Sequence, residues 1–260
     1  MSLAPIGVVA IAAVVVMSLA WLRQTRTLNA GWVDVIWALM TGAAAVWYGA
    51  SGEGAMVPRA LTALLGGLWG LRLAAHLGRR LYGAPEDSRY ASMRERTNGN
   101  QRAFVVMYAI QAILVVVCSL PFFASAANPV EGFTPWTIAA IVVWVVAVGG
   151  ETIADAQLAR FRAAPTNKGR VCDVGLWQYS RHPNYFFEWL HWFTYALLAI
   201  GSPIQWLAWL GPVLMFVLVY FVSGVPFAER ASLRSRGNAY REYQARVSKF
   251  FPLPRKTTRT

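Results

Sequence analysis

The sequence is 260 residues long, 57% hydrophobic and only 14% charged, with a mean hydropathy of +0.41. A soluble domain carries roughly 25% charged residues, so this composition excludes an ordinary soluble protein. The net charge of +12 would suggest nucleic-acid binding in a soluble chain, but here the basic residues gather between apolar stretches. We therefore predict an all-α, polytopic membrane protein that does not bind nucleic acid, with residues 1–260 forming one integral membrane domain surrounded by lipid.

Stretches of roughly 18–20 apolar residues can cross a bilayer, and we count seven candidates in this chain. They are expected at about 4–22, 31–50, 58–77, 103–124, 135–158, 183–200 and 203–223. With seven spans, 22 of the 24 lysines and arginines lie in loops on one side or in the C-terminal tail. The positive-inside rule then places the N-terminus outside and the C-terminus in the cytoplasm.

The second and third spans carry polar residues at membrane depth. Asp34 lies near the cytoplasmic end of the second span, where it either faces a cavity or pairs with arginines of the first loop. Arg72 and His76 share a face of the third span, and Arg72 needs a partner because an unpaired charge in lipid is costly. Gly66 and Gly70 form a small-xxx-small pair that favours packing against a neighbouring helix over dimerisation.

The third loop, from 82 to 101, holds the mixed-charge run Pro85-Glu-Asp-Ser-Arg-Tyr-Ala-Ser-Met-Arg-Glu-Arg. This run predicts a short surface helix. The loop is either a solvated connection or a lid over a functional site.

The fifth span ends with two carboxylates, Glu151 and Asp155, which share one helix face at a spacing of four residues. Like charges at this spacing repel unless cations or ligand hydroxyl groups satisfy them. Arg162 lies two turns further along the same face. The two carboxylates lie deeper in the membrane than Arg162. This order suits a ligand with ribose or amide groups inside and phosphates near the cytoplasm. The alternative is pairing of the acids with Arg72 or Arg181.

The start of the sixth span combines cationic and polar groups. Pro183 fits the first turn of a helix, which places Arg181 and His182 at the helix N-terminus, where anions are favoured. Asn184 and Glu188 follow on one face of that helix. We interpret this stretch as the mouth of a site for an anionic cofactor or substrate.

The chain has only three histidines, and Glu188-Trp-Leu-His191 is a single Glu-x-x-His motif. Di-iron helical bundles use this motif in pairs, so we predict no metal site.

The C-terminal tail, from 240 to 252, has the pattern of an amphipathic cytoplasmic helix. Tyr240 and Tyr243 share a face, and they stack on a base, close a pocket or anchor the tail to the membrane surface.

The segment 175–192, with Glu151 and Asp155 before it and the tail 243–252 after it, resembles the steroid 5α-reductase family, and more closely that family's bacterial branch. The motif Arg-His-Pro-x-Tyr also occurs in sterol C14 reductases and isoprenylcysteine carboxyl methyltransferases. The resemblance covers about 31–252 and is strongest after Gly149. It implies a seven-helix fold in which NADPH enters from the cytoplasmic side and contacts mainly residues 135–254.

The family's cofactor contacts come from the end of the fifth span, the next loop, the Asn-x-x-x-Glu block and the tail. Its animal members also place a Gln-Glu pair on the second span and a Tyr on the third, and this chain departs from that pattern. Asp34 and His76 are the nearest candidates for the catalytic proton donor. The implied cofactor-binding residues are Glu151, Asp155, Arg162, Arg170, Tyr179, Arg181, His182, Asn184, Tyr185, Glu188, Tyr240 and Tyr243.

The resemblance implies that hydride from NADPH adds to the β-carbon of a conjugated enone, such as C5 of a 3-oxo-Δ4 steroid. An acid then stabilises the enolate at the ketone oxygen, and the α-carbon takes a proton. A steroid-like substrate would enter from the bilayer. The expected location is the bacterial inner membrane, with the cofactor site facing the cytoplasm.

Two alternatives stay open. A membrane methyltransferase that uses S-adenosylmethionine is the first, although that cofactor lacks the phosphates that the arginines around the fifth loop would bind. The second is a lipid- or sterol-binding protein with a degenerate site.

Overall fold

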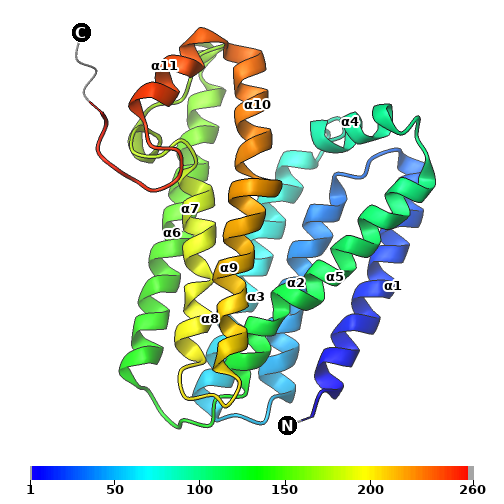
Figure 1. The fold of residues 1–260 in the computed structure, drawn as a ribbon, viewed down its shortest axis with the longest axis vertical. Coiled ribbons are helices and arrows are strands. Elements are labelled where there is room, and N and C mark those ends of the chain that lie inside the picture. Colours follow the sequence, from blue (N-terminus) through cyan, green and yellow to red (C-terminus); the bar gives the residue numbers. More distant parts are fainter. Residues whose placement is uncertain (1, 257–260) are drawn as a thin grey trace. The chain divides into compact units, whose positions relative to one another are not determined.

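The computed structural model describes residues 2–256, and every named secondary-structure element in this part is a helix (Figure 1). The chain divides into two compact units. Unit 1 contains the residues up to Thr137 together with Tyr195–Gly211, and unit 2 contains Ile138–Thr194 and the chain from Pro212 onward. We describe each unit by itself. The single integral membrane domain stays a prediction.

Six helical segments of the described residues are long and apolar enough to cross a membrane, which supports an integral membrane protein. The seven-span count and the orientation of the termini stay predictions. The six segments are α1 (Ala4–Thr27), α2 (Trp32–Ser51), α3 (Met56–Leu81), α5 (Gln101–Ala126), α6 (Pro135–Ala163) and the segment Gln205–Arg236.

The region expected as the sixth span, 183–200, is not one long helix. It contains α7 (Pro183–His191) and α8 (Phe193–Leu198), which are separated at Trp192. The nine residues of α7 extend about 14 Å, far less than the roughly 30 Å of a bilayer core. Apolar composition predicted a span here because hydropathy does not report where a helix breaks.

The last long segment is not one regular α-helix. It comprises the 3-10 helix η3 (Gln205–Trp209), α9 (Leu210–Val217), the π-helix η4 (Leu218–Val222) and α10 (Val225–Arg236). A Cβ on Gly224 would lie 2.7 Å from the carbonyl oxygen of Val219, so only glycine fits this junction.

Unit 1 is held together by close backbone contact between α2 and α3. A Cβ on Gly70 would lie 2.7 Å from the Cα of Gly42, and a Cβ on Gly66 would lie 2.3 Å from the Cβ of Ala45. The predicted packing of this glycine pair against a neighbouring helix is therefore confirmed. Small residues serve this role in membranes because lipid provides no hydrophobic force between helices, so close packing must stabilise them.

Buried hydroxyl groups connect α5 to the same pair of helices. The hydroxyl oxygens of Tyr48 on α2 and Ser119 on α5 lie 3.2 Å apart, and those of Thr62 on α3 and Ser125 on α5 lie 2.8 Å apart. Hydrogen bonds of this kind add to helix association in lipid, where no water competes for the groups.

The third loop contains the predicted surface helix, α4 (Ser88–Arg96). Asp87 caps its first turn, because the Asp87 carboxylate accepts a hydrogen bond from the backbone N–H of Arg89.

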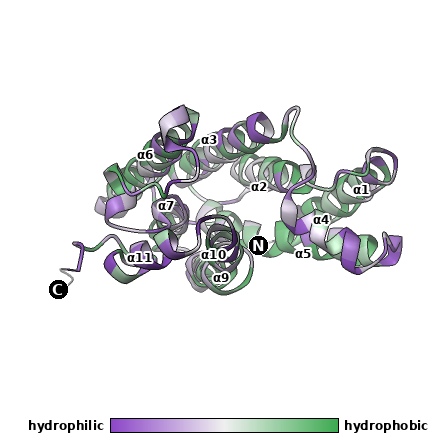
Figure 2. Cartoon of the chain, turned by 90° about the horizontal axis from the view of Figure 1, so that it is seen from above, coloured by the Kyte–Doolittle hydropathy of each residue, from purple (hydrophilic) through white to green (hydrophobic). Residues whose placement is uncertain are grey.

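Unit 2 contains most of α6 together with α7, η1 (Pro165–Asn167), η2 (Gly175–Gln178), α10 and α11 (Asn238–Arg246). The helices α6 and α7 approach closely, since a Cβ on Gly150 would lie within about 2.6 Å of the Phe187 ring. In Figure 2, α9 is coloured mainly as hydrophobic, whereas α11 carries hydrophilic colour. The composition of α11 therefore indicates a helix outside the apolar part of unit 2.

Candidate functional site

A polar contact joins α6 and α7 in unit 2. The Asp155 carboxylate accepts a hydrogen bond from the Asn184 side-chain amide at 3.2 Å. The Asn184 carbonyl oxygen in turn accepts from the backbone N–H of Tyr185 at 3.0 Å, which fixes the amide in the first turn of α7. Glu151 and Glu188 are both buried, and Glu188 accepts a hydrogen bond from the Trp192 indole at 3.2 Å. The structure thus brings together two of the predicted cofactor residues, Asp155 and Asn184.

A basic pocket lies where α6 ends and the next loop begins. Its volume is about 510 Å³. Arg170 was predicted as a site residue, whereas Arg160 was not, and the exposed Arg162 does not line the pocket. The missed signal was a helical face, since Arg160 and Phe161 lie three and four residues after Gln157. The pocket is lined by Gln157, Arg160, Phe161, Asn167, Arg170, Val171, Asp173 and Val174.

Gln157 connects this pocket to the following loop. Its side-chain oxygen accepts a hydrogen bond from the backbone N–H of Leu176 at 2.8 Å. The Trp177 indole donates to the carbonyl of Ala154 at 2.9 Å. Two bonds from α6 therefore fix η2, the short helix that leads into Ser180 and Arg181.

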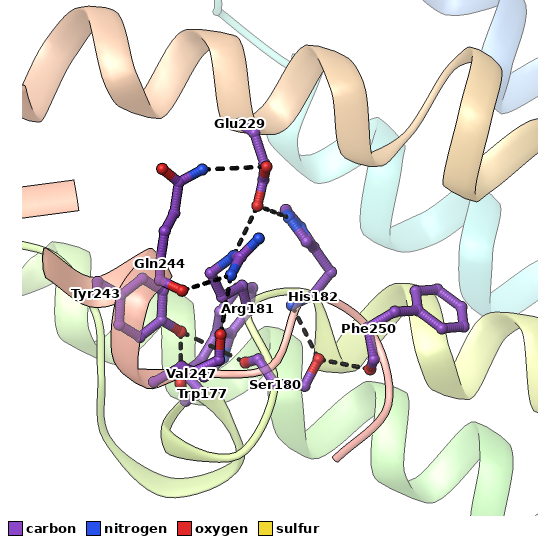
Figure 3. Close-up of polar contacts among 9 residues, drawn as sticks. All are labelled: Trp177, Ser180, Arg181, His182, Glu229, Tyr243, Gln244, Val247 and Phe250. Atoms are coloured by element: carbon purple, nitrogen blue, oxygen red, sulfur yellow. Dashed lines mark hydrogen bonds and ion pairs between the residues drawn. The ribbon is translucent and has the colours of Figure 1, made fainter. Parts of the chain in front are cut away.

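Arg181 and His182 have partners within unit 2 (Figure 3). Arg181 Nε lies 2.7 Å from Glu229 Oε1, and Arg181 Nη1 donates to the carbonyls of Gln244 at 3.0 Å and Val247 at 2.9 Å. His182 Nε2 lies 3.4 Å from the same Glu229 oxygen. The structure thus places Arg181 and His182 against α10 and the tail.

His182 is almost fully buried, and its burial lowers the pKa of the imidazole below the ordinary value of 6.5. The hydrogen bond and charge of Glu229 act in the opposite direction and do not cancel this effect. His182 is therefore neutral at pH 7, and its ring stacks on Tyr185 with 5.6 Å between centroids.

The tail tyrosines are covered by the chain. Tyr243 donates from its hydroxyl to the carbonyl of Trp177 and also contacts that of Ser180 at 3.4 Å. Tyr240 is 4% exposed and Tyr243 is 2% exposed, and their rings lie 5.7 Å apart. Burial raises the pKa of Tyr240 to about 12 and that of Tyr243 further, so both hydroxyls are protonated at neutral pH. In this arrangement they shape the loop that precedes α7.

Residues 247–256, which we name the C-terminal strap, run along the loop before α7. The backbone N–H of Arg181 donates to the carbonyl of Ser248 at 2.9 Å, and the Ser180 hydroxyl donates to that of Phe250 at 2.7 Å. Leu253 donates from its backbone to the carbonyl of Tyr179, whose side chain is 43% exposed. The strap therefore holds the loop that positions the N-terminus of α7.

The two predicted catalytic residues, Asp34 and His76, belong to unit 1, whereas the predicted cofactor residues belong to unit 2. Asp34 accepts a hydrogen bond from Arg89 Nη2 at 2.6 Å and another from the Tyr90 hydroxyl at 2.7 Å. Both partners lie on α4 rather than in the first loop. His76 is half-buried on α3.

Tyr90 was not among the predicted site residues. Its burial, together with the Asp34 charge, raises the pKa of the Tyr90 phenol well above its ordinary value. A signal was present, because Asp87 caps α4 and thereby fixes its first turn, which contains Arg89 and Tyr90.

Among residues 2–256, no three His, Cys, Asp or Glu side chains lie close enough to hold a metal ion.

The comparisons with known proteins give a family. A family model described as a protein of unknown function, DUF1295, matches residues 20–247. The chain belongs to this family. DUF1295 lies within the steroid 5-alpha reductase-like superfamily, so the predicted resemblance is confirmed at that level. The matched region runs from within α1 to the residue after α11 and includes every predicted site residue.

A relative and a negative result complete the comparison. An uncharacterized protein of Schizosaccharomyces pombe is 25% identical over 264 residues, which cover 89% of this chain and 75% of the relative. No solved structure matches the chain significantly.

Proposed function

We propose that this protein is an NADPH-dependent membrane reductase that saturates a conjugated enone, such as the Δ4 bond of a 3-oxo steroid. The observation that carries the proposal is the arrangement along α6. The Asp155–Asn184 contact lies about two turns before the C-terminal end of α6, and the arginine-lined pocket lies at that end. Membership of the steroid 5-alpha reductase-like superfamily supports the same reaction class.

The residues of unit 2 fit the chemical groups of NADPH. Arg160 and Arg170 offer planar guanidinium groups, which bind phosphate through paired hydrogen bonds. Asp155 offers a carboxylate that can accept from ribose hydroxyl groups. A pocket of about 510 Å³ holds only part of a dinucleotide, so the rest of the cofactor would extend from it.

When bound, NADPH would supply the hydride. The chain must then stabilise negative charge on the ketone oxygen and deliver a proton. Asp34 and His76 were predicted for this task. Because Asp34 accepts hydrogen bonds from both Arg89 and Tyr90, Tyr90 is the member of this cluster that carries a transferable proton. We therefore add Tyr90 to the candidate donors, with Asp34 orienting its hydroxyl.

The remaining unit 2 residues would have positioning roles. Arg181, His182, Tyr240 and Tyr243 bind other parts of the chain, and their contacts hold the loop before α7. We expect the cofactor to enter from the cytoplasm and the apolar substrate to enter from the bilayer of the membrane that holds the protein.

The decisive experiment measures NADPH oxidation by the detergent-purified protein with and without progesterone, followed by mass spectrometry of the product. We expect a product that has gained two hydrogen atoms only when NADPH is present. Absence of this product, with thermal stabilisation by S-adenosylmethionine and not by NADPH, would replace the proposal with the methyltransferase.

That alternative has one observation in its favour. The Asp155 carboxylate could accept from the ribose hydroxyls of S-adenosylmethionine as well as from those of NADPH. The arginine-lined pocket favours NADPH, because only NADPH carries phosphates.

A variant tests the cofactor site directly. We expect Asp155→Ala to weaken NADPH binding about tenfold, which corresponds to about 1.4 kcal/mol. The control is Glu242→Ala, which removes an exposed carboxylate of the same unit. Equal affinity in both variants would remove Asp155 from the cofactor site.

A further inference from the structure

A second pocket of unit 2 lies beneath the C-terminal strap and shares no lining residue with the arginine-lined pocket at the end of α6. Its volume is about 320 Å³. It is lined by Arg181, Gln244, Val247, Ser248, Lys249, Leu253, Pro254 and Lys256. Three of these side chains are cationic, and no carboxylate lines the pocket.

The lysine content makes this composition unusual. The whole chain has only three lysines, Lys168, Lys249 and Lys256, and its other basic residues are arginines. Two of the three line this one pocket. The strap pocket therefore differs in composition from the rest of the basic surface, which is rich in arginine.

The cationic groups are available to a ligand. Arg181 uses Nε for Glu229 and Nη1 for two carbonyls, while its Nη2 has no hydrogen bond within the described residues. Lys249 has its ammonium 4.2 Å from the centroid of the Tyr220 ring, a contact that holds the group without using its charge in an ion pair. Lys256 is exposed and its backbone N–H is fixed by the carbonyl of Arg246.

The main repulsive groups near the pocket are already neutralised. The C-terminal end of α11 would present carbonyl oxygens that disfavour an anion. Arg181 donates to the carbonyls of Gln244 and Val247, which belong to that end. The carboxylate of Glu229, the ion-pair partner of Arg181, also accepts a hydrogen bond from Gln244. The field inside the pocket therefore remains positive.

We propose that this strap pocket binds a phosphate group through Lys249, Lys256 and Arg181 Nη2. The group can belong to free phosphate or to the headgroup of an anionic lipid. Binding would clamp the strap onto the loop before α7 and stabilise unit 2. This site is separate from the proposed cofactor site, so it does not depend on the proposed reaction.

The first test is lysine footprinting of the full-length protein with an amine-reactive ester and mass spectrometry. Lys168 lies directly after η1, outside the strap pocket, and serves as an internal control. At phosphate concentrations twice the dissociation constant, labelling of Lys249 and Lys256 should fall about threefold while that of Lys168 is unchanged. Sodium chloride at equal ionic strength should protect none of them. Equal protection of all three lysines, or of none, would overturn the proposal.

The second test compares matched double variants. Lys249→Gln with Lys256→Gln should abolish the phosphate-dependent rise in melting temperature. Arg234→Gln with Arg241→Gln, which removes the same charge from exposed positions outside the pocket, should retain it. An equal rise in both double variants would contradict the site.

Two further arms identify the source of the phosphate group. Nanodiscs that contain phosphatidylglycerol, compared with pure phosphatidylcholine, would protect the two lysines if a lipid headgroup is the ligand. Protection by inorganic phosphate in detergent alone would indicate a soluble ligand. Protection by NADPH but not by phosphate or phosphatidylglycerol would assign the pocket to the cofactor and overturn the separate site.

Discussion

Asp34 in unit 1 and Glu229 in unit 2 are two carboxylates in similar surroundings. Asp34 pairs with Arg89 at 2.6 Å, and Glu229 pairs with Arg181 at 2.7 Å. The residue after each arginine, Tyr90 or His182, contacts the same carboxylate. In both cases the arginine and its neighbour come from a short loop or helix end. The two clusters differ in the other partners of each arginine.

Arg89 has a second carboxylate, because its Nε lies 3.0 Å from Asp87 Oδ1 on the same helix. Arg181 instead donates to two backbone carbonyls at the end of α11. The Asp34 cluster therefore connects α2 with α4 and, through the ion pair between Arg80 and Asp87, with the end of α3, whereas the Glu229 cluster connects the loop before α7, α10 and α11. Removal of Asp34 would leave Arg89 with the Asp87 carboxylate, whereas removal of Glu229 would leave Arg181 with backbone carbonyls in place of a carboxylate.

The largest effect should come from Glu229→Ala. Arg181 has only 9% of its side chain exposed, so the variant leaves a nearly buried cation without a carboxylate. We expect a loss of about 3–5 kcal/mol in the free energy of unfolding. Chemical denaturation and limited proteolysis after α10 would report it. Glu242→Ala, the exposed control on α11, should change stability little.

Asp34→Asn should cost less, about 1 kcal/mol, because Arg89 keeps its bond to Asp87 and an amide oxygen still accepts from Tyr90. The same denaturation experiment measures the difference. A loss as large as that of Glu229→Ala would show that the two clusters contribute equally to stability, which would contradict the compensating role of Asp87.

Tyr90→Phe removes one hydrogen bond and should reduce the free energy of unfolding by about 0.5–1.5 kcal/mol. Its effect on turnover separates structure from chemistry. If Tyr90 is the proposed donor, enone reduction should fall by roughly 10²–10⁴-fold while NADPH affinity is kept. Retained turnover would return the role to His76.

The smallest effect concerns pH. Because the pKa of buried His182 lies below 6.5, the unfolded chain binds a proton first on acidification. Stability should therefore be constant above pH 6.5 and fall as the pH drops from 6.5 toward the folded-state pKa. A pH series of melting temperatures should show this slope in the wild type and not in His182→Gln.

Unit 1 should respond in a lower pH window. Burial raises the pKa of Asp87, but the hydrogen bonds and charges of Arg89 and the charge of Arg80 outweigh it, so its pKa lies below 3.8. The stability that Asp87 contributes is present above pH 3.8 and is lost as the pH falls through its folded-state pKa. Hydrogen exchange should show unit 2 loosening before α4 does.

Much of the helical architecture was predictable, because hydropathy over 18–20 residues measures the property that places a helix in lipid. The close contact of Gly66 and Gly70 with α2 also followed from a local pattern. The division of 183–200 at Trp192 did not, since an apolar run gives the same signal whether its helix is continuous or broken.

The candidate site was predictable in part. The Asp155–Asn184 contact joins residues selected from two helical faces, each of which is a local pattern. The partners of the Arg181 side chain lie between 48 and 66 residues away in the sequence, and no periodicity encodes such pairs. The same holds for Tyr90, which meets Asp34 across 56 residues.

The strap has a consequence for biosynthesis. Arg181 donates a hydrogen bond to the carbonyl of Val247, 66 residues later, so the loop before α7 cannot reach its final form until that part of the chain has been synthesised. At translation rates of about 5–20 residues per second, the delay is roughly 3–13 s. The membrane helices can insert in order as they emerge, but this loop cannot form its contacts until Val247 has been synthesised. A ribosome that stalls just before Val247 would therefore leave an inserted protein whose loop is still open.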